Sequence, residues 1–298
     1  MGNAARTRAR AQARTSRERL AARRAADRRA ATRRRLLLAG GSVAVVIALV
    51  VTLVVVKLNQ GPARSPGTAS AQTTARVTRE ISTVRAATFD TVGTGTATGL
   101  KTVTGQPALT SDGKPEVLYI GGEYCPYCAA ERWALATALS RFGTLSGVSL
   151  IHSSPTDVYP STPTMSFARA HYTSTYVSFV PVEWFGQGTD PSTPFGHAYL
   201  QQPTGAEQAL FTKYGNQSIP FVDIGNRYIL PQVQYIPSAL ANMSWDQIAA
   251  ALHDPSSPVA RDIDGAANII AAAIAALTHG QPAAVAHSAG VQAAKGSL

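Results

Sequence analysis

The feature that most constrains this chain is a run of 21 residues, 36–56, that contains no charged side chain. Coiled as an α-helix, this run is about 30 Å long, which matches the hydrocarbon core of a bilayer. A segment inside a bilayer must pair its backbone N–H and C=O groups internally, and a helix does so. The sequence therefore predicts one transmembrane helix over residues 36–57.

The positive charge of the chain is concentrated before this run. Residues 1–35 hold 13 Arg against Glu18 and Asp27, whereas the rest of the chain carries 14 basic and 15 acidic side chains. Because Arg-rich flanks stay in the cytoplasm, we expect a single-pass cell-membrane protein with a cytoplasmic tail at 1–35 and residues 58–298 outside the cytoplasm. The tail is expected to contact anionic lipid, and its charge indicates no specific nucleic acid partner.

Two kinds of export signal are alternatives to an uncleaved anchor. A cleaved signal peptide has a shorter apolar core and a nearby cleavage site, whereas the small residues 69–71 lie well beyond this run. Residues 32–37 resemble a twin-arginine signal, but a tail with so many Arg produces such a match by chance. The uncleaved anchor is the preferred interpretation.

The chain after the anchor begins without periodicity. Residues 58–80 predict a flexible stalk, and residues 81–115 contain short β-leaning pieces among Gly and Thr. The Gly-rich run 93–99 lacks the following Gly-Lys-Ser/Thr of a phosphate-binding loop, so we expect an ordinary loop there.

A strand, a helix and a second strand are expected around the two cysteines. Residues 117–120 form a short apolar run typical of a buried strand, residues 129–142 are rich in helix formers, and residues 148–151 resemble a second strand. This order predicts a βαβ unit with parallel strands.

The later elements are predicted from turn and cap residues. Gly225-Asn226 separates two apolar runs and predicts a hairpin over 221–230. Ser244 is an expected N-cap for a helix at 245–253. Further elements are a loop at 154–174, a strand at 176–185 with Pro181 at an edge, a helix at 206–214, and a last helix at 260–277 packed on the domain.

The chemistry of the chain is expected at its only two cysteines, Cys125 and Cys128. Between a strand and a helix, Cys125 lies at the helix N-terminus, where unpaired N–H groups and the helix dipole favour a thiolate. Pro126 fits the first turn because its missing N–H costs nothing there. Cys125 is therefore the expected attacking thiol and Cys128 the resolving thiol.

Two inert interpretations of the dithiol remain open. A zinc site needs two more ligands, and the six His of the chain are scattered without paired spacing. A static disulfide between Cys125 and Cys128 closes only a very short ring, which constrains the unfolded chain little. Redox activity is the favoured interpretation, and no metal or cofactor is expected.

Two stretches resemble thioredoxins. Residues 117–128 resemble their strand and active-site loop, and residues 218–226 resemble their cis-proline loop and hairpin. The resemblance implies a cis bond between Ile219 and Pro220 beside the dithiol, with the Ile219 backbone pairing with an incoming peptide. It implies an α/β, thioredoxin-like fold over 81–256. The remaining residues, 257–298, are expected to form a C-terminal helix and tail.

The two thioredoxin-like stretches lie farther apart than in a minimal thioredoxin, so an insertion is expected at about 154–200. More closely still, residues 113–133 and 140–143 resemble membrane-anchored proteins known only as domain-of-unknown-function family 929. That resemblance supplies no established activity.

The site departs from thioredoxins in its buried acid. In thioredoxins a buried acid helps to deprotonate the resolving thiol, and Tyr119 occupies the corresponding position here. Glu123 is a substitute candidate, although a solvated loop acid is the simpler interpretation of this residue. Pro126 and Tyr127, shared with glutaredoxins, are expected to tune the dithiol, but no glutathione-binding residues are recognised.

The sequence thus predicts a membrane-anchored, extracytoplasmic thiol–disulfide oxidoreductase that acts on exported thiol or disulfide proteins. Oxidation or isomerisation is favoured over reduction. Because the chain has only two cysteines and none in the anchor, electrons must pass to a separate membrane redox partner or a small thiol. The alternative is a non-catalytic thioredoxin-fold module that binds a membrane or envelope partner.

Overall fold

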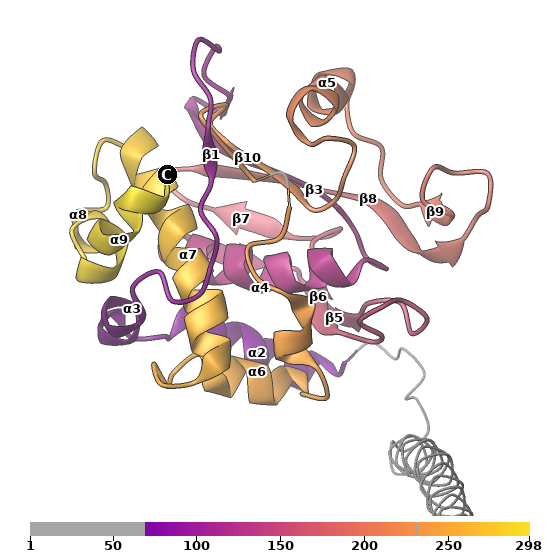
Figure 1. Cartoon of the computed structure of the whole chain (residues 1–298), viewed down its shortest axis with the longest axis horizontal. Helices are drawn as coiled ribbons and strands as arrows, with labels where there is room; N and C mark the ends of the chain where they lie inside the picture. The colour runs from indigo at the N-terminus through magenta and orange to yellow at the C-terminus, as the bar shows by residue number, and fades with distance from the viewer. Residues whose placement is uncertain (1–68, 231) are drawn as a thin grey trace, which may run out of the picture. The chain divides into compact units, whose positions relative to one another are not determined.

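The computed structural model describes residues 69–230 and 232–298 (Figure 1). The predicted tail at 1–35, the predicted transmembrane helix at 36–57 and most of the predicted stalk lie outside the described residues. Within residues 69–230 and 232–298, no helix is both long enough and apolar enough to cross a membrane.

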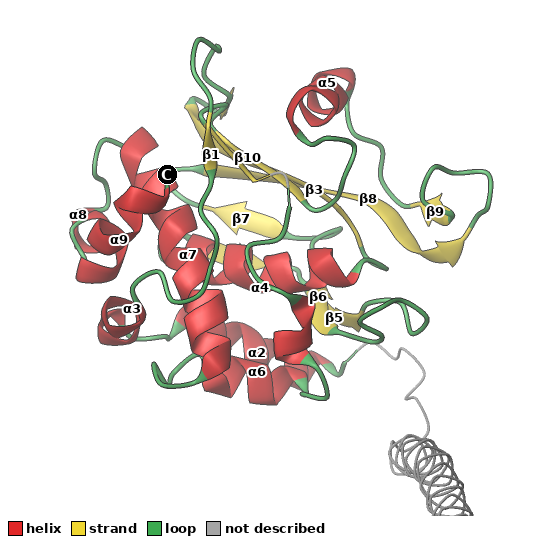
Figure 2. Ribbon diagram, viewed as in Figure 1, coloured by secondary structure: helices red, strands yellow, loops and turns green. Residues whose placement is uncertain are grey.

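A mixed β-sheet forms the centre of the described chain (Figure 2). Its central strand is β3 (Lys114–Gly122), which runs parallel to β8 (Ser178–Thr189) and antiparallel to β10 (Phe221–Ile224). On the β10 side follow β11 (Tyr228–Leu230) and β1 (Lys101–Thr102), and on the β8 side follows β9 (His197–Tyr199). The short β2 (Thr110–Ser111) pairs with the start of β3. The hairpin predicted over 221–230 is confirmed as β10 and β11.

The partner of the active-site strand differs from the prediction. Residues 148–151 were expected to run parallel to the first strand, but β5 (Ser149–His152) pairs antiparallel with β6 (Pro163–Ser166) in a separate two-stranded sheet. The parallel neighbour of β3 is β8 instead. This position is covered on both faces and requires apolar side chains on both. β8 supplies them, with Phe179 on one face and Val180 and Val182 on the other, whereas only Leu150 of β5 is buried.

The same finding corrects the prediction of an insertion at 154–200. This segment contains β8, which lies beside the central strand of the sheet. The segment also supplies β6, and β7 (His171–Thr173), which pairs with β4 (Thr144–Ser146) in a second small sheet. Pro181 lies opposite Tyr119 in β8, and β9 pairs with β8 only from Phe185 onward. The proline therefore takes an edge position, as predicted.

Helices cover both faces of the sheet. On one face lie α4 (Pro126–Leu139) and the long α7 (Pro258–Leu277), whose side chains form one apolar cluster with Val117 and Tyr119 of β3. On the other face lies α5 (Gly205–Tyr214), which packs against Leu118 and Ile120. Figure 1 shows α4 and α5 on opposite sides of β3 and β8.

The remaining helices pack around α4 and α7. α6 (Trp245–Ala251) is capped by the Ser244 side chain, as predicted, and the short α3 (Ala86–Val92), α8 (Ala283–Ala286) and α9 (Ala289–Ala294) lie near α7. Two 3₁₀ turns, η1 (Pro237–Leu240) and η2 (Lys295–Ser297), complete the described elements. The predicted helices at 206–214, 245–253 and 260–277 are confirmed within one or two residues at each end.

The stalk prediction is wrong for residues 71–80. They belong to α2 (Ala71–Ser82), which begins at the Ser70 cap and buries Val77 and Ile81. Only these two apolar residues, four apart on one face, fix the helix to the core, so the pattern is too sparse to be recognised among Thr, Arg and Gln.

Candidate functional site: a buried dithiol

Cys125 and Cys128 lie at the N-terminus of α4, both as free thiols. Cys125 is the N-cap, and its Sγ accepts a hydrogen bond of 3.3 Å from the backbone N–H of Cys128. Pro126 occupies the first turn, as predicted, and Tyr127 is the one residue of α4 that is not buried. Cys125 is 5% exposed and Cys128 is 0% exposed. The attacking thiol therefore reaches the surface only at its tip.

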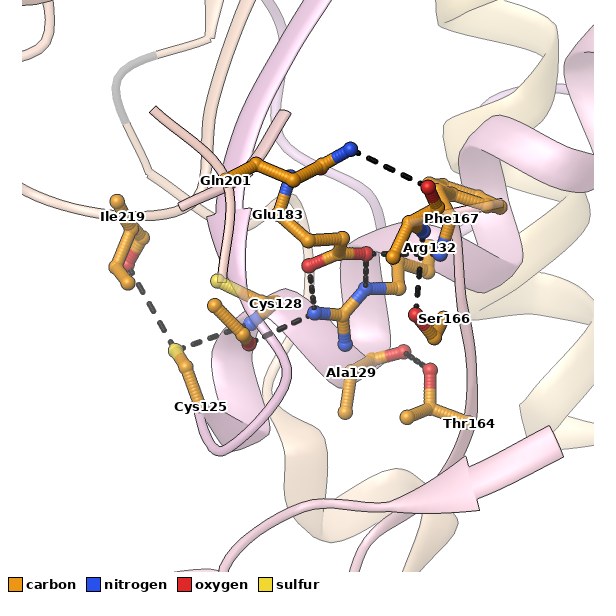
Figure 3. A network of polar contacts seen from close by, with 12 residues as sticks. Cys125, Cys128, Ala129, Arg132, Thr164, Ser166, Phe167, Glu183, Gln201 and Ile219 are labelled. Atoms are coloured by element: carbon orange, nitrogen blue, oxygen red, sulfur yellow. Dashed lines mark hydrogen bonds and ion pairs between the residues drawn. The ribbon is translucent and has the colours of Figure 1, made fainter. Parts of the chain in front are cut away.

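The loop before β10 lies against this dithiol (Figure 3). The Ile219–Pro220 peptide bond is cis, which confirms the sequence prediction. The Cys125 thiol lies 4.0 Å from the Ile219 carbonyl oxygen, to which it donates. The structure therefore brings together two segments that are 94 residues apart in the chain.

The two thiols differ in acidity. Burial opposes ionisation of Cys125, but hydrogen bonds from the Cys128 thiol and N–H, together with the charge of Arg132, outweigh it and hold the pKa of Cys125 below its ordinary value. Burial raises the pKa of Cys128 well above its ordinary value, and the neighbouring Cys125 raises it further. Cys125 thus ionises first, and Cys128 keeps its proton. An attacking thiol and a resolving thiol require this order of ionisation.

A buried ion pair lies next to the dithiol (Figure 3). The Arg132 guanidinium donates from Nε to Glu183 Oε1 at 2.8 Å and from Nη2 to Glu183 Oε2 at 2.6 Å. Both side chains are 0% exposed. The sequence does not predict this pair. Arg132 follows Cys128 by four residues and therefore shares its helix face, but no local pattern connects it to Glu183 in β8.

The structure separates the two residues that were considered for the role of buried acid. Tyr119 is fully buried, and its hydroxyl has no hydrogen-bond partner within residues 69–230 and 232–298. Burial raises the pKa of Tyr119 well above its ordinary value, so the phenol is neutral. Glu123 is half-buried and lines a cavity of about 550 Å³ together with His152, Arg169 and other residues. In the described chain, the carboxylate of Glu123 forms no hydrogen bond with either cysteine.

Segments from the expected insertion form walls around the dithiol. Tyr159 packs edge-on against Tyr127, with ring centroids 5.7 Å apart. His197 of β9 stacks on Tyr124, with centroids 3.6 Å apart. The backbone N–H of Ser154 donates to the Tyr124 carbonyl oxygen at 2.7 Å. The segment that sequence reasoning set apart therefore shapes the access to Cys125.

The residues around the dithiol define the chemical class of the site. Within residues 69–230 and 232–298, no three His, Cys, Asp or Glu side chains are grouped so as to hold a metal ion. What the site holds is a pair of thiols of unequal acidity beside a buried ion pair. The molecule is thus an α/β protein with a pair of cysteines at the start of a buried helix.

A family model agrees with the resemblance noted in the sequence. The model described as "Domain of unknown function (DUF929)" matches residues 102–276, which is more than half of the chain. The chain therefore belongs to this family. Comparisons with curated proteins and with solved structures found no match.

Proposed function

We propose that this protein is a thiol–disulfide oxidoreductase with a thioredoxin-like fold. The observation that carries the proposal is the environment of Cys125. Its sulfur accepts a backbone N–H at the N-terminus of α4 and lies 4.0 Å from the carbonyl oxygen of a cis Ile219–Pro220 bond. A thiol in such a position ionises readily and is a nucleophile for disulfides.

The topology around the dithiol supports the assignment of the fold. β3, α4 and β8 form a βαβ unit with parallel strands, and the two cysteines lie between its first strand and its helix. A C-x-x-C pair in this position is typical of thioredoxin-like redox proteins. The large segment between α4 and β10 distinguishes this chain from a minimal member of that class.

The reaction that we propose is an exchange of disulfides. When the dithiol acts as a reductant, the Cys125 thiolate attacks a substrate disulfide, forms a mixed disulfide and expels one substrate sulfur as a thiolate. Cys128 then loses its proton to that thiolate or to water, and its sulfur forms a bond to Cys125 while the second substrate sulfur leaves with the electron pair. Oxidation of a substrate dithiol is the same sequence run in reverse, and isomerisation combines the two.

The lowered pKa of Cys125 favours oxidation or isomerisation over reduction. Stabilising the thiolate stabilises the reduced form of the dithiol, which makes its disulfide a stronger oxidant. We propose that the substrates are exported proteins, reached by a domain held outside the cytoplasm by the predicted anchor. With two cysteines in the chain, the electrons must continue to a separate membrane redox partner or a small thiol.

The low exposure of the dithiol favours a second candidate. Cys125 is 5% exposed and packs in one cluster with Tyr124 and Ile219. A thiol that a protein disulfide cannot reach suits a non-catalytic module that binds a membrane or envelope partner.

Trapping of mixed disulfides tests the proposal. In Cys128→Ser the resolving thiol is absent, so we expect substrates to accumulate on Cys125 as adducts that a reducing agent releases. Cys125→Ser is the matched control and should form none. If Cys128→Ser yields no adducts in cells although a small maleimide labels its Cys125, the oxidoreductase is excluded and the binding module is favoured.

A further inference from the structure

The buried ion pair is attached to the loop that carries the dithiol. Besides its two bonds to Glu183, the Arg132 guanidinium donates from Nη2 to the Gly122 carbonyl oxygen at 2.7 Å. The same oxygen accepts the backbone N–H of Cys125 at 3.1 Å. One carbonyl therefore joins the guanidinium to the turn that positions Cys125.

The two charges of the pair are not equally satisfied. The Glu183 carboxylate accepts three hydrogen bonds, two from Arg132 and one of 3.0 Å from the backbone N–H of Phe167. The Arg132 Nη1 atom is buried and has no hydrogen-bond partner in the part of the chain that the structure describes. Since a donor without a partner is costly inside a protein, the positive end of the pair retains an unused capacity to stabilise an anion.

The groups that face the two sulfurs come from every element packed against them. They are Tyr119 of β3, Tyr124 of the active-site loop, and Tyr127 and Arg132 of α4. Glu183 of β8 pairs with Arg132, His197 stacks on Tyr124, and Asp157 acts on Tyr124 and Tyr127. Burial raises the pKa of both Tyr119 and Tyr124, so these phenols are neutral at ordinary pH. Among these groups, Arg132 is the fixed cation.

We propose that Arg132, held in place by Glu183, is a positioning residue that stabilises the thiolates of Cys125 and Cys128. An arginine takes up no proton, so it acts by its charge. The proton of Cys128 passes to the departing substrate thiolate or to water, and Arg132 lowers the free energy of the Cys128 thiolate that remains. This inference deepens the proposed function and rests on it.

Two neutralising variants of the full-length chain, purified in detergent, distinguish a role of charge from a role in packing. Arg132→Met removes the cation and Glu183→Gln removes the anion, while both keep the approximate shape of the side chain. The pKa of Cys125 is read from the pH dependence of its alkylation by a small maleimide. The reduction potential of the dithiol is read in a glutathione redox buffer, and circular dichroism checks the fold.

The two variants should shift the pKa of Cys125 and the reduction potential of the dithiol in opposite directions. Arg132→Met should raise the pKa of Cys125 by about one unit, which is about a tenfold loss of thiolate below the pKa, and should lower the reduction potential. Glu183→Gln should lower the pKa of Cys125 and raise the potential. Arg76→Met, which removes an arginine from the exposed pair with Asp246, is the control and should leave both values unchanged.

Shifts in the same direction, or no shift in either variant, would overturn the inference and leave the pair with a role in packing alone. If a single variant does not fold, the double variant Arg132→Met/Glu183→Leu leaves no unpaired buried charge. Its Cys125 pKa should still rise, and an unchanged pKa would overturn the inference. These readouts need no protein substrate, so they stand apart from the trapping experiment that tests the proposed function.

Discussion

Two neighbouring residues of α4, Glu131 and Arg132, are both fully buried, yet they lie in different regions of the molecule. Arg132 faces β8 and the dithiol, where Glu183 pairs with it through two hydrogen bonds. Glu131 faces the loop before η1, where its Oε2 accepts a 3.2 Å hydrogen bond from the Gln234 backbone N–H. Its Oε1 has no partner among the residues that the structure describes.

The difference between the two regions shows what decides whether a buried group keeps its charge. Burial raises the pKa of Glu131 to about 8, so at neutral pH this carboxyl is protonated in the folded protein. Arg132 stays charged because a carboxylate of opposite sign lies in direct contact with it. Consecutive helix residues point about 100° apart. Arg132 therefore lies on the side of α4 that faces the dithiol, here called the redox side, and Glu131 lies on the side that faces the loop before η1, here called the structural side.

Breaking the Arg132–Glu183 pair should have the largest effect on the stability of the protein. Glu183→Ala leaves the Arg132 charge buried without a partner, so we expect a loss of about 3–5 kcal/mol in the free energy of unfolding. Urea titration followed by circular dichroism measures it. Arg76→Ala is the matched control, because the Arg76–Asp246 pair has side chains that are 52% and 45% exposed and should contribute little.

If the two variants lose similar stability, the contrast between the buried pair and an exposed pair is wrong. The comparison is sharpest at moderate ionic strength, where salt screens the exposed pair and leaves the buried pair almost unaffected.

Replacing Glu131 by a neutral residue should increase the free energy of unfolding, whereas breaking the Arg132–Glu183 pair should decrease it. Because the pKa of Glu131 is about 8 in the folded protein and ordinary in the unfolded chain, the unfolded chain releases a proton between about pH 4.5 and 8 that the folded protein retains. Stability therefore falls as the pH rises through this window. Glu131→Gln cannot release this proton, so its stability does not fall in this window. The variant should be more stable than the natural chain by about 2–4 kcal/mol at pH 8.

Urea titrations at several pH values measure this difference. It should vanish below about pH 4.5, where Glu131 is protonated in both states. Buried Asp264, whose pKa burial raises to about 8, contributes the same background to both proteins and cancels in the comparison. A Glu131→Gln variant that is less stable than the natural chain at pH 8 would show that the carboxyl is charged and partnered.

The smallest effect is expected at Tyr235, which closes the structural side of α4. Its hydroxyl donates to the Ala130 carbonyl oxygen at 2.5 Å. Tyr235→Phe removes this single neutral hydrogen bond and should cost about 1 kcal/mol in the free energy of unfolding. The pKa of Cys125 should stay the same, since Tyr235 does not face the dithiol. A shift of that pKa in Tyr235→Phe would show that the two sides of α4 are coupled.

The features that depend only on neighbouring residues could be predicted from the sequence. Cys125 caps α4 and Pro126 follows it because both roles need only the next few residues. Gly225-Asn226 fixes the β10–β11 hairpin, and Ser244 fixes the start of α6, for the same reason. The cis bond before Pro220 was found by resemblance to a loop of known form.

Which distant segments meet depends on packing across the whole fold and could not be predicted. β8 rather than β5 became the neighbour of β3, because the position beside β3 needs apolar side chains on both faces. Because β8 lies beside β3, Glu183 contacts Arg132, which is 51 residues away in the chain. A buried charge is tolerated only where a partner arrives from elsewhere in the fold, and no local pattern records where that partner will come from.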